Sequence, residues 1–354
     1  MPDIFVAGAG MAGLAAAAEA RRLGAKPFVS EKLGRPGGSM RLSSGVIWRH
    51  LDFSKFREEC PDGDPRLQRV MFERLDSDID WLESLGAPVL RRDTANPLTT
   101  GARFDPGGLT RALVEAVGGV QLDDPLVEAY ESVPLILATG GFGASRELLA
   151  EHVTPEADHV FLRSAPGSTG DGLRIGLAAG GSAGAGLDQV YARAMPAPPA
   201  RIGDGDLVRL SQLYAKHAKV TNESGEGYAT RTWSEIDVAQ WQLRQPRARA
   251  WFTVPIGRLR ERVRERTVAE MVEAAEAAGA PVRWGEDDVT VETVAGVTTT
   301  LGGLAIDKDA RVANGVYACG ADAGGIATGG YASGLAAALV FGRIAARAAL
   351  GESP

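Results

Sequence analysis

The chain has 354 residues, of which 45% are hydrophobic, and it carries a formal net charge of −7. This acidic balance argues against a nucleic-acid-binding surface, and no apolar run approaches the roughly 18 to 20 residues that a membrane span requires. Two distant cysteines and four scattered histidines have neither disulfide-framework nor ligand spacing, so we predict no metal site.

The first predicted element is an apolar strand, residues 4–7, which runs into a glycine-rich turn and an alanine-rich helix. The chain begins directly on this strand, without a leader segment, so we expect a cytoplasmic protein. The turn has the spacing Gly8-x-Gly10-x-x-Gly13, which allows a tight turn, approach of a pyrophosphate and close helix-on-strand packing. The helix start adds free N–H groups and a positive dipole end, which favour a phosphate.

Glu31 ends a second apolar stretch, residues 27–30, at roughly the 20-residue distance where an acid binds the adenosine ribose hydroxyls. An acid at this place also disfavours the 2′-phosphate of NADP. Glycine-rich turns before helices can serve plain packing as well. The strand, the helix and the acid together therefore carry the prediction of a dinucleotide site.

Three later segments favour FAD over NAD. The first segment contains Gly37-Gly38-Ser39 and, shortly after, Ser43-Ser44-Gly45. Its backbone amides and serine hydroxyls can line a long cofactor. An ordinary loop is the alternative. The second is a buried strand that enters a glycine turn, residues 135–143. The third, residues 168–172, opens a helix rich in alanine and glycine.

In this order the motifs resemble those of the flavoprotein family of fumarate reductases, succinate dehydrogenases, 3-ketosteroid dehydrogenases and tricarballylate dehydrogenase-like proteins. The resemblance implies an α/β fold, with a Rossmann-like FAD-binding domain built on a parallel sheet and a small inserted α+β cap domain. A serine-containing segment stands where the family's flavin-attached histidine would be, so we expect noncovalent FAD. The predicted cofactor-binding residues are Gly8, Gly10, Ala12, Gly13, Glu31, Lys32, Gly37, Gly38, Ser39, Ser43, Ser44, Gly45, Ala138, Thr139, Gly140, Gly141, Thr169, Gly170, Asp171, Gly320, Asp322, Ser333, Gly334 and Leu335.

The cofactor motifs pause after a proline-rich linker near residue 196 and resume near residue 300. We therefore predict an FAD-binding domain at 1–196 and 299–354 and an inserted capping domain at 197–298. Within the insertion, apolar spacing predicts an amphipathic helix over 258–278. The gap between 125 and 134 is shorter than the excursion that family members usually carry, which indicates a shortened member.

The C-terminal part is predicted to contain a strand, residues 316–320, and an alanine-rich helix, residues 333–350. The start of this helix would aim amides and a positive dipole at the flavin N1 and C2 carbonyl, where negative charge gathers on reduction. Asp322 is the predicted partner of a ribityl hydroxyl, with a solvated loop acid as the alternative.

Four residues are candidates for catalysis. Tyr331 stands beside the predicted flavin edge and could exchange a proton, unless it serves as a core aromatic. Tyr191 and Arg193 fall where fumarate reductase-like members have a histidine-containing substrate motif. Arg231 is a candidate carboxylate clamp, with an exposed arginine as the alternative. Because Glu235 stands where fumarate reductases have their proton-donating arginine, we do not expect fumarate–succinate chemistry.

The resulting prediction is an FAD-dependent oxidoreductase that dehydrogenates a C–C bond next to a carbonyl or a carboxylate, by hydride transfer to the flavin. An ene-type reductase, and a flavin-binding non-redox protein or isomerase, remain as alternatives. The predicted partners are a small-molecule acid or ketone and a separate electron donor or acceptor, or oxygen.

Overall fold

The computed structural model of the protein describes residues 1–125 and 133–352. The predicted short crossing at 125–134 lies largely outside these residues. The chain forms two compact units. The first, called here the FAD unit, comprises Met1–Ser145, Ser164–Gln189 and Thr299–Pro354, and the second unit comprises Arg146–Arg163 and Val190–Thr298.

These limits differ from the predicted domain boundaries in two places. The second unit takes in residues 146–163 and begins at 190 rather than at 197. Strand pairing explains both differences, because β7 (Phe161–Leu162) and β8 (Val190–Pro196) each pair with the long strand β15 (Asp288–Thr300). Short strands of this kind carry little pattern of their own in the sequence.

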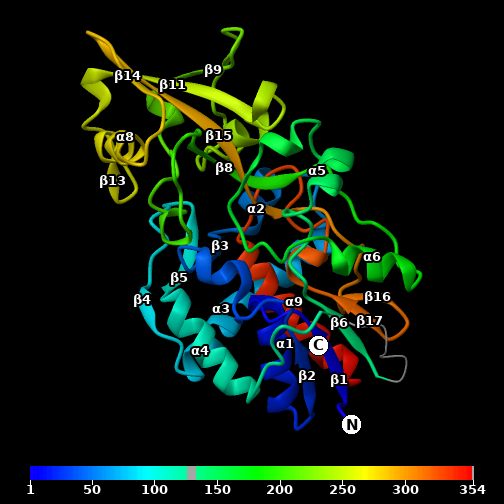
Figure 1. Ribbon diagram of the computed structural model, residues 1–354. Helices are drawn as coiled ribbons and strands as arrows, with labels where there is room; N and C mark the ends of the chain where they lie inside the picture. The colour runs from blue at the N-terminus through cyan, green and yellow to red at the C-terminus, as the bar shows by residue number, and fades with distance from the viewer. Residues whose placement is uncertain (126–132, 353–354) are drawn as a thin grey trace. The chain divides into compact units, whose positions relative to one another are not determined.

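A five-stranded sheet forms the centre of the FAD unit, in the order β16-β17-β6-β1-β2 (Figure 1). Four strands run parallel, and β16 joins the edge antiparallel to β17. The parallel α/β architecture predicted from the sequence is confirmed. The strands are β1 (Ile4–Ala7), β2 (Pro27–Ser30), β6 (Leu135–Leu137), β17 (Val316–Ala318) and β16 (Arg311–Ala313).

Helices from opposite ends of the chain pack together in the FAD unit. A Cβ atom added at Gly342, in α9, would lie 2.4 Å from the Ala12 carbonyl oxygen, in α1, so glycine lets the two backbones approach. A small antiparallel sheet, β3-β5-β4, completes this unit. The remaining bounds are α1 (Met11–Arg22), α2 (Phe53–Glu59), α3 (Pro65–Ser84), α4 (Pro106–Val117), α6 (Asp171–Ala178), α9 (Gly334–Ala349), β3 (Val46–His50), β4 (Val89–Arg91) and β5 (Thr99–Phe104).

A buried ionic cluster joins α1, α3 and α9. Arg343 pairs with Glu19 at 2.9 Å and with Asp78, and its guanidinium lies 4.3 Å from the centre of the Trp81 ring. Burial opposes ionisation of Glu19, but hydrogen bonds and charges from Arg22 and Arg343 outweigh it and lower the pKa to about 2. Burial raises the pKa of Asp78 to about 6 despite its pairing with Arg343.

The second unit is built on a sheet with the path β10-β9-β11-β15-β14 (Figure 1). Apolar residues of β11, β15 and α8 form its core. The elements are β9 (Lys219–Thr221), β10 (Gly227–Tyr228), β11 (Arg249–Pro255), β12 (Arg262–Val263), β13 (Arg266–Thr267), β14 (Val282–Trp284), α5 (Arg146–His152), α7 (Ile236–Gln242) and α8 (Val268–Ala277).

The predicted helix over 258–278 is wrong in its first half. The helix α8 begins at Val268, where Thr267 and Glu270 form a capping box. Before it, β12 and β13 pair as a hairpin, and Arg264 in the turn has a φ of 57°. The left-handed backbone at Arg264 is incompatible with a continuous helix through this position. The capping box at Thr267 and Glu270 then sets the start of α8.

Candidate flavin site and tyrosine–arginine cluster

The turn between β1 and α1 uses its three glycines in different ways. A Cβ atom at Gly8 would lie 2.3 Å from the Ala138 carbonyl oxygen, and one at Gly13 would lie 1.8 Å from the Gly8 carbonyl oxygen. In contrast, nothing lies within 4 Å of a Cβ position at Gly10, which precedes the first residue of α1. Open space before a helix N-terminus with no side-chain cap is a cradle that fits a phosphate.

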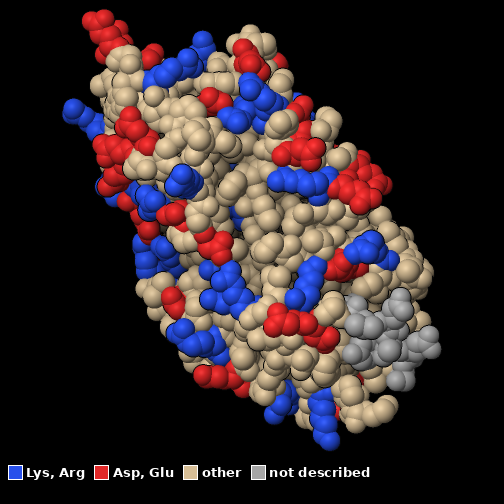
Figure 2. Space-filling view, viewed as in Figure 1, with Lys and Arg blue, Asp and Glu red and all other residues tan. Residues whose placement is uncertain are grey.

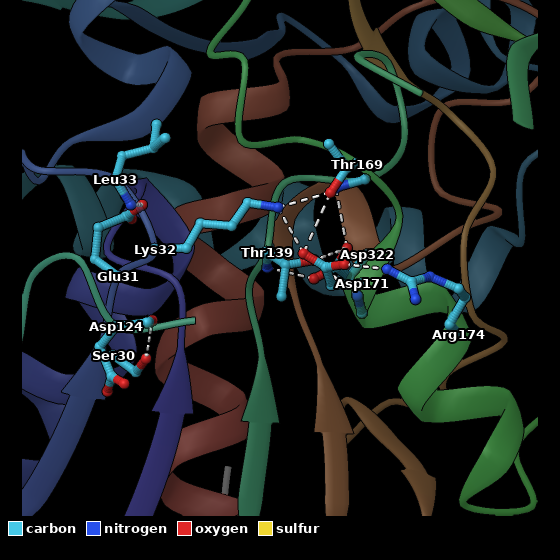
Figure 3. A network of polar contacts seen from close by, with 12 residues as sticks. Ser30, Glu31, Lys32, Leu33, Asp124, Thr139, Thr169, Asp171, Arg174 and Asp322 are labelled. Atoms are coloured by element: carbon cyan, nitrogen blue, oxygen red, sulfur yellow. Dashed lines mark hydrogen bonds and ion pairs between the residues drawn. The ribbon is translucent and has the colours of Figure 1, made fainter. Parts of the chain in front are cut away.

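Glu31 braces this turn. Its carboxylate accepts hydrogen bonds from the backbone N–H groups of Ala9 and Leu33, each at 2.9 Å. Glu31 is 7% exposed, and Figure 3 shows it beside Lys32 and Leu33 just after β2. The predicted contact of Glu31 with the adenosine ribose stays a prediction.

Asp322 ties the turn after β6 to the C-terminal part of the chain (Figure 3). Its carboxylate accepts hydrogen bonds from the Thr139 backbone N–H, from the Thr139 hydroxyl at 3.0 Å and from the Gly141 N–H at 3.0 Å. Asp322 is 1% exposed, and burial raises the pKa of its carboxyl group. The alternative of a solvated loop acid is therefore wrong, and its predicted role toward the ribityl chain stays a prediction.

Lys32 links the end of β2 to the start of α6. Its ammonium contacts the Thr169 hydroxyl and the Asp171 carboxylate, both at 2.6 Å, and Figure 3 shows its side chain extended toward them. Gly170 has a φ of 87° and precedes the first residue of α6. Gly140, with a φ of 94°, lies against Ser168, so a side chain there would be strained and crowded.

The segment from Gly37 to Gly45 folds back onto the β1–α1 turn. Gly37 has a φ of 104° and donates its N–H to the Ala9 carbonyl at 2.7 Å, while Gly38 lies close to Gly10. The hydroxyl of Ser39 accepts a hydrogen bond from the Ala165 N–H. The other members of the segment shape its turn: the Ser43 hydroxyl bonds Met40 and Gly45, and Ser44 lies next to it before β3.

The start of α9 forms a second open helix N-terminus in the FAD unit. Ser333 caps the helix by accepting the Ala336 N–H at 3.2 Å, and nothing lies within 4 Å of a Cβ position at Gly334. Leu335 follows in the first turn, and Gly320, with a φ of 65°, packs against Ala12. Together with the cradle at Gly10, these residues fit a long cofactor with anionic groups. Within residues 1–125 and 133–352, no cluster of histidine, cysteine or acidic side chains could hold a metal.

Tyr331 also lies at the start of α9. Its hydroxyl accepts the Gly334 N–H at 3.5 Å, and its ring meets Trp48 edge-on with centres 5.9 Å apart. The structure thus places Tyr331 in the FAD unit, whereas the other three catalytic candidates lie in the second unit.

In the second unit, Tyr191 and Arg193 form a pair on β8. The Arg193 Nε donates to the Tyr191 hydroxyl at 2.8 Å, and another guanidinium nitrogen donates to the Ser234 carbonyl. Burial by itself would raise the pKa of Tyr191. The charges of Arg193, Arg163 and Arg264, with the hydrogen bond from Arg193, lower it overall.

Arg163 and Arg264 are members of this cluster that the sequence did not reveal. Arg163 is buried and donates to the Thr298 hydroxyl at 2.9 Å. Desolvation, followed by the positive charge of Arg193, lowers the pKa of Arg264 to about 10, so Arg264 still carries its charge at neutral pH. The residue as a whole is exposed, with its guanidinium 5.4 Å from the Trp233 ring centre. Arg264 was missed because the helix predicted over 258–278 placed it on a regular helix. Arg163 was missed because it lies outside every motif.

Two other residues have local structural roles. Arg231 is exposed and donates to the Tyr228 hydroxyl at 3.2 Å, a contact that does not involve Tyr191 or Arg193. Glu235 accepts the backbone N–H groups of Ala215 and Lys216, each at 3.0 Å. The side chain at the position of the expected proton-donating arginine therefore caps a turn.

Basic and acidic side chains alternate over the face seen in Figure 2.

Among the described residues, no helix is both long enough and apolar enough to cross a membrane. Cys60 and Cys319 are both free and buried.

Two curated proteins are similar to the chain. The NADH:fumarate oxidoreductase of Klebsiella pneumoniae (strain 342) is 24% identical over 49% of this chain and 24% of its own length. The probable fumarate reductase Ifc3 of Shewanella frigidimarina (strain NCIMB 400) is 23% identical over 97% of this chain and 74% of its own length. The chain thus spans about a quarter of the first relative and about three quarters of the second.

Solved structures show the same fold. An open flavocytochrome c3 fumarate reductase aligns with a TM-score of 0.74 and 20% identity, covering 99% of this chain and 78% of that one. The 3-ketosteroid-Δ4-(5α)-dehydrogenase of Rhodococcus jostii RHA1 aligns with a TM-score of 0.70 and 18% identity, covering 98% and 96%. The predicted enzyme class agrees with these proteins.

The model of one protein family, described as the FAD binding domain, matches residues 3–123 and 104–335. These matches include the β1–α1 turn, the turn after β6, the start of α6 and the start of α9. The predicted flavoprotein family and the FAD cofactor are confirmed, while noncovalent attachment stays a prediction. With a match over most of its length, this chain belongs to the FAD binding domain family.

Proposed function

We propose that the protein is an FAD-dependent oxidoreductase that acts on a C–C bond next to a carboxylate, with noncovalent FAD. When bound, FAD supplies a hydride acceptor or donor. The observation that carries the proposal is the cluster of arginines around Tyr191. The sequence left open whether the substrate is an acid or a ketone, and this cluster favours an acid.

The charge of the cluster supports a carboxylate. Arg193 and Arg264 make no ion pair with a carboxylate within the described residues, and Arg264 is exposed. A guanidinium binds two carboxylate oxygens at once, and such charge-assisted hydrogen bonds are stronger than neutral ones. A neutral ketone would bring no opposite charge to the buried guanidinium of Arg193.

The pairing of Tyr191 with Arg193 supports a role in proton transfer. A phenol of lowered pKa gives up and regains a proton more easily near neutral pH. We propose that Tyr191 moves the proton at the carbon adjacent to the one that exchanges hydride. Tyr331, which contacts Gly334 at the start of α9, is the second candidate for this role.

We propose a division of roles between the two units. The FAD unit carries the cofactor-binding residues, and the second unit, including the predicted cap at 197–298, carries the groups that bind the substrate. Exclusion of water by the cap would strengthen the electrostatic effect of the arginines. A separate electron donor or acceptor, or oxygen, would complete the cycle.

Reduction of an unsaturated acid is the second candidate. The names of both curated relatives favour this direction. Glu235 argues against fumarate reduction by the mechanism of the fumarate reductases. It stands at the position of their proton-donating arginine, and its carboxylate accepts two backbone N–H groups. Dehydrogenation of an acid therefore remains the leading proposal.

The test is a visible absorption spectrum before and after acid precipitation, followed by anaerobic screening of saturated acids against matched ketones. We expect flavin bands that acid releases, and bleaching by a carboxylic acid but not by its ketone analogue. Bleaching by ketones alone would overturn the substrate class. A protein that takes up no FAD would overturn the whole proposal.

A further inference from the structure

The loop that carries Tyr331, residues 325–331, interlocks with a segment from the other end of the FAD unit, residues 59–68. A Cβ atom at Gly330 would lie 1.7 Å from the Glu59 carbonyl oxygen, and one at Gly329 would lie 2.8 Å from Asp62. The Asp64 N–H donates to the Gly325 carbonyl at 2.8 Å. The two stretches touch along their backbones, so movement of one requires movement of the other.

Gln68 joins the two stretches through its side-chain amide. Its Nε2 donates to the Cys60 carbonyl and to the Ile326 carbonyl, each at 2.9 Å, and its Oε1 accepts from Arg57 at 2.6 Å. Gln68 is fully buried. One amide group thus satisfies a carbonyl on each side, and no apolar residue of similar size could replace both bonds.

Cys60 shows how close this junction is to Tyr331. Burial raises the pKa of the Cys60 thiol to about 12, and a hydrogen bond from the Tyr331 backbone N–H acts in the opposite direction. The thiol is therefore covered by the Tyr331 loop and protonated. A thiol in this state reacts only when the loop opens.

We propose that Gln68 is a positioning residue for the active site, which fixes the 325–331 loop and hence Tyr331 at the start of α9. The inference rests on the proposed function, because it takes this loop to adjoin the flavin. Gln68 lies on α3 and acts only through the carbonyl groups that it holds. A small displacement of an aligned catalytic group can lower turnover strongly.

Gln68→Met tests the proposal in a Cys319→Ser background, where Cys60 is the remaining cysteine of the two. We expect the rate of Cys60 labelling by a thiol reagent to rise on the order of tenfold, because two hydrogen bonds that close the loop are lost. We also expect kcat to fall on the order of tenfold with KM little changed, and the midpoint potential of bound FAD to become more negative.

Gln242→Met is the matched control, since Gln242 is also fully buried but bonds Thr293 in the second unit. It should leave Cys60 labelling unchanged. Gln68→Glu gives a second variant should Gln68→Met fail to fold, because a carboxylate keeps the Arg57 contact and cannot donate to the two carbonyls.

Unchanged labelling in the Gln68 variant would overturn the proposal, and so would faster labelling with unchanged kcat and potential. Tyr331→Phe separates this inference from the proposed function. If its turnover equals that of the wild type, the proton role of Tyr331 fails, while Cys60 labelling and the flavin potential still report on Gln68. If Gln68 acts through Tyr331, the double variant is no slower than Tyr331→Phe alone.

Discussion

The two units each contain a cluster of arginines, and the clusters differ in what balances their charge. In the FAD unit, Arg343 faces the carboxylates of Glu19 and Asp78. In the second unit, Arg193 donates a hydrogen bond to the Tyr191 phenol, and the charges of Arg193 and Arg264 lower the pKa of that phenol. Within the described residues neither arginine pairs with a carboxylate. Balanced arginines hold helices together, whereas an excess of positive charge costs stability and suits an anionic ligand.

The comparison predicts the largest effect for Glu19→Gln. This change leaves Arg343 with one carboxylate in a buried site, so we expect the free energy of unfolding at pH 7 to fall by about 3 kcal/mol. The pKa of Glu19 is about 2 in the folded chain against an ordinary 4.5, so its contribution is complete above pH 4.5 and is lost as the pH falls toward 2. Urea unfolding of both proteins across this range should show the difference shrinking, and a constant difference would contradict the assignment.

Tyr191→Phe should act on activity and spare stability. Removal of the phenol takes away the proposed proton carrier, and we expect kcat to fall by about a hundredfold. Thermal unfolding should stay within a few degrees of the wild type. Arg231→Ala is the control, because that exposed side chain contacts Tyr228 instead, and its turnover should be retained. If the kcat of Tyr191→Phe equals that of the wild type, Tyr191 has no role in proton transfer.

Arg264→Gln should give a smaller effect that sharpens the comparison. Loss of one positive charge would raise the pKa of Tyr191 and weaken carboxylate binding, with KM for an acid substrate rising by about tenfold. The melting temperature should stay equal or increase, because less like charge is gathered in one place. Steady-state kinetics and thermal melts measure both effects. A clear loss of stability would show that Arg264 holds the fold in the way that Arg343 does.

The sequence predicted the FAD unit well because its site is formed largely by backbone. Gly8, Gly13 and Gly140 occupy places where sterics or a positive φ exclude other residues, so the chemistry leaves a visible pattern. The tyrosine–arginine cluster gave a weaker signal. It gathers side chains from β8, from the end of β7 and from a hairpin, and arginine at each site has many other uses. The helix predicted over 258–278 failed because apolar spacing could not show the left-handed turn at Arg264.

The close contact between α1 and α9 has a consequence for synthesis of the protein. Residues near position 12 pack on residues near position 342, and the sheet places β17 beside β6. The ribosome therefore completes the second unit while the FAD unit still lacks two strands, β16 and β17, and the helix α9. We expect the second unit to acquire structure first. The β1–α1 turn should reach its final conformation only after α9 has been synthesised and has packed on α1.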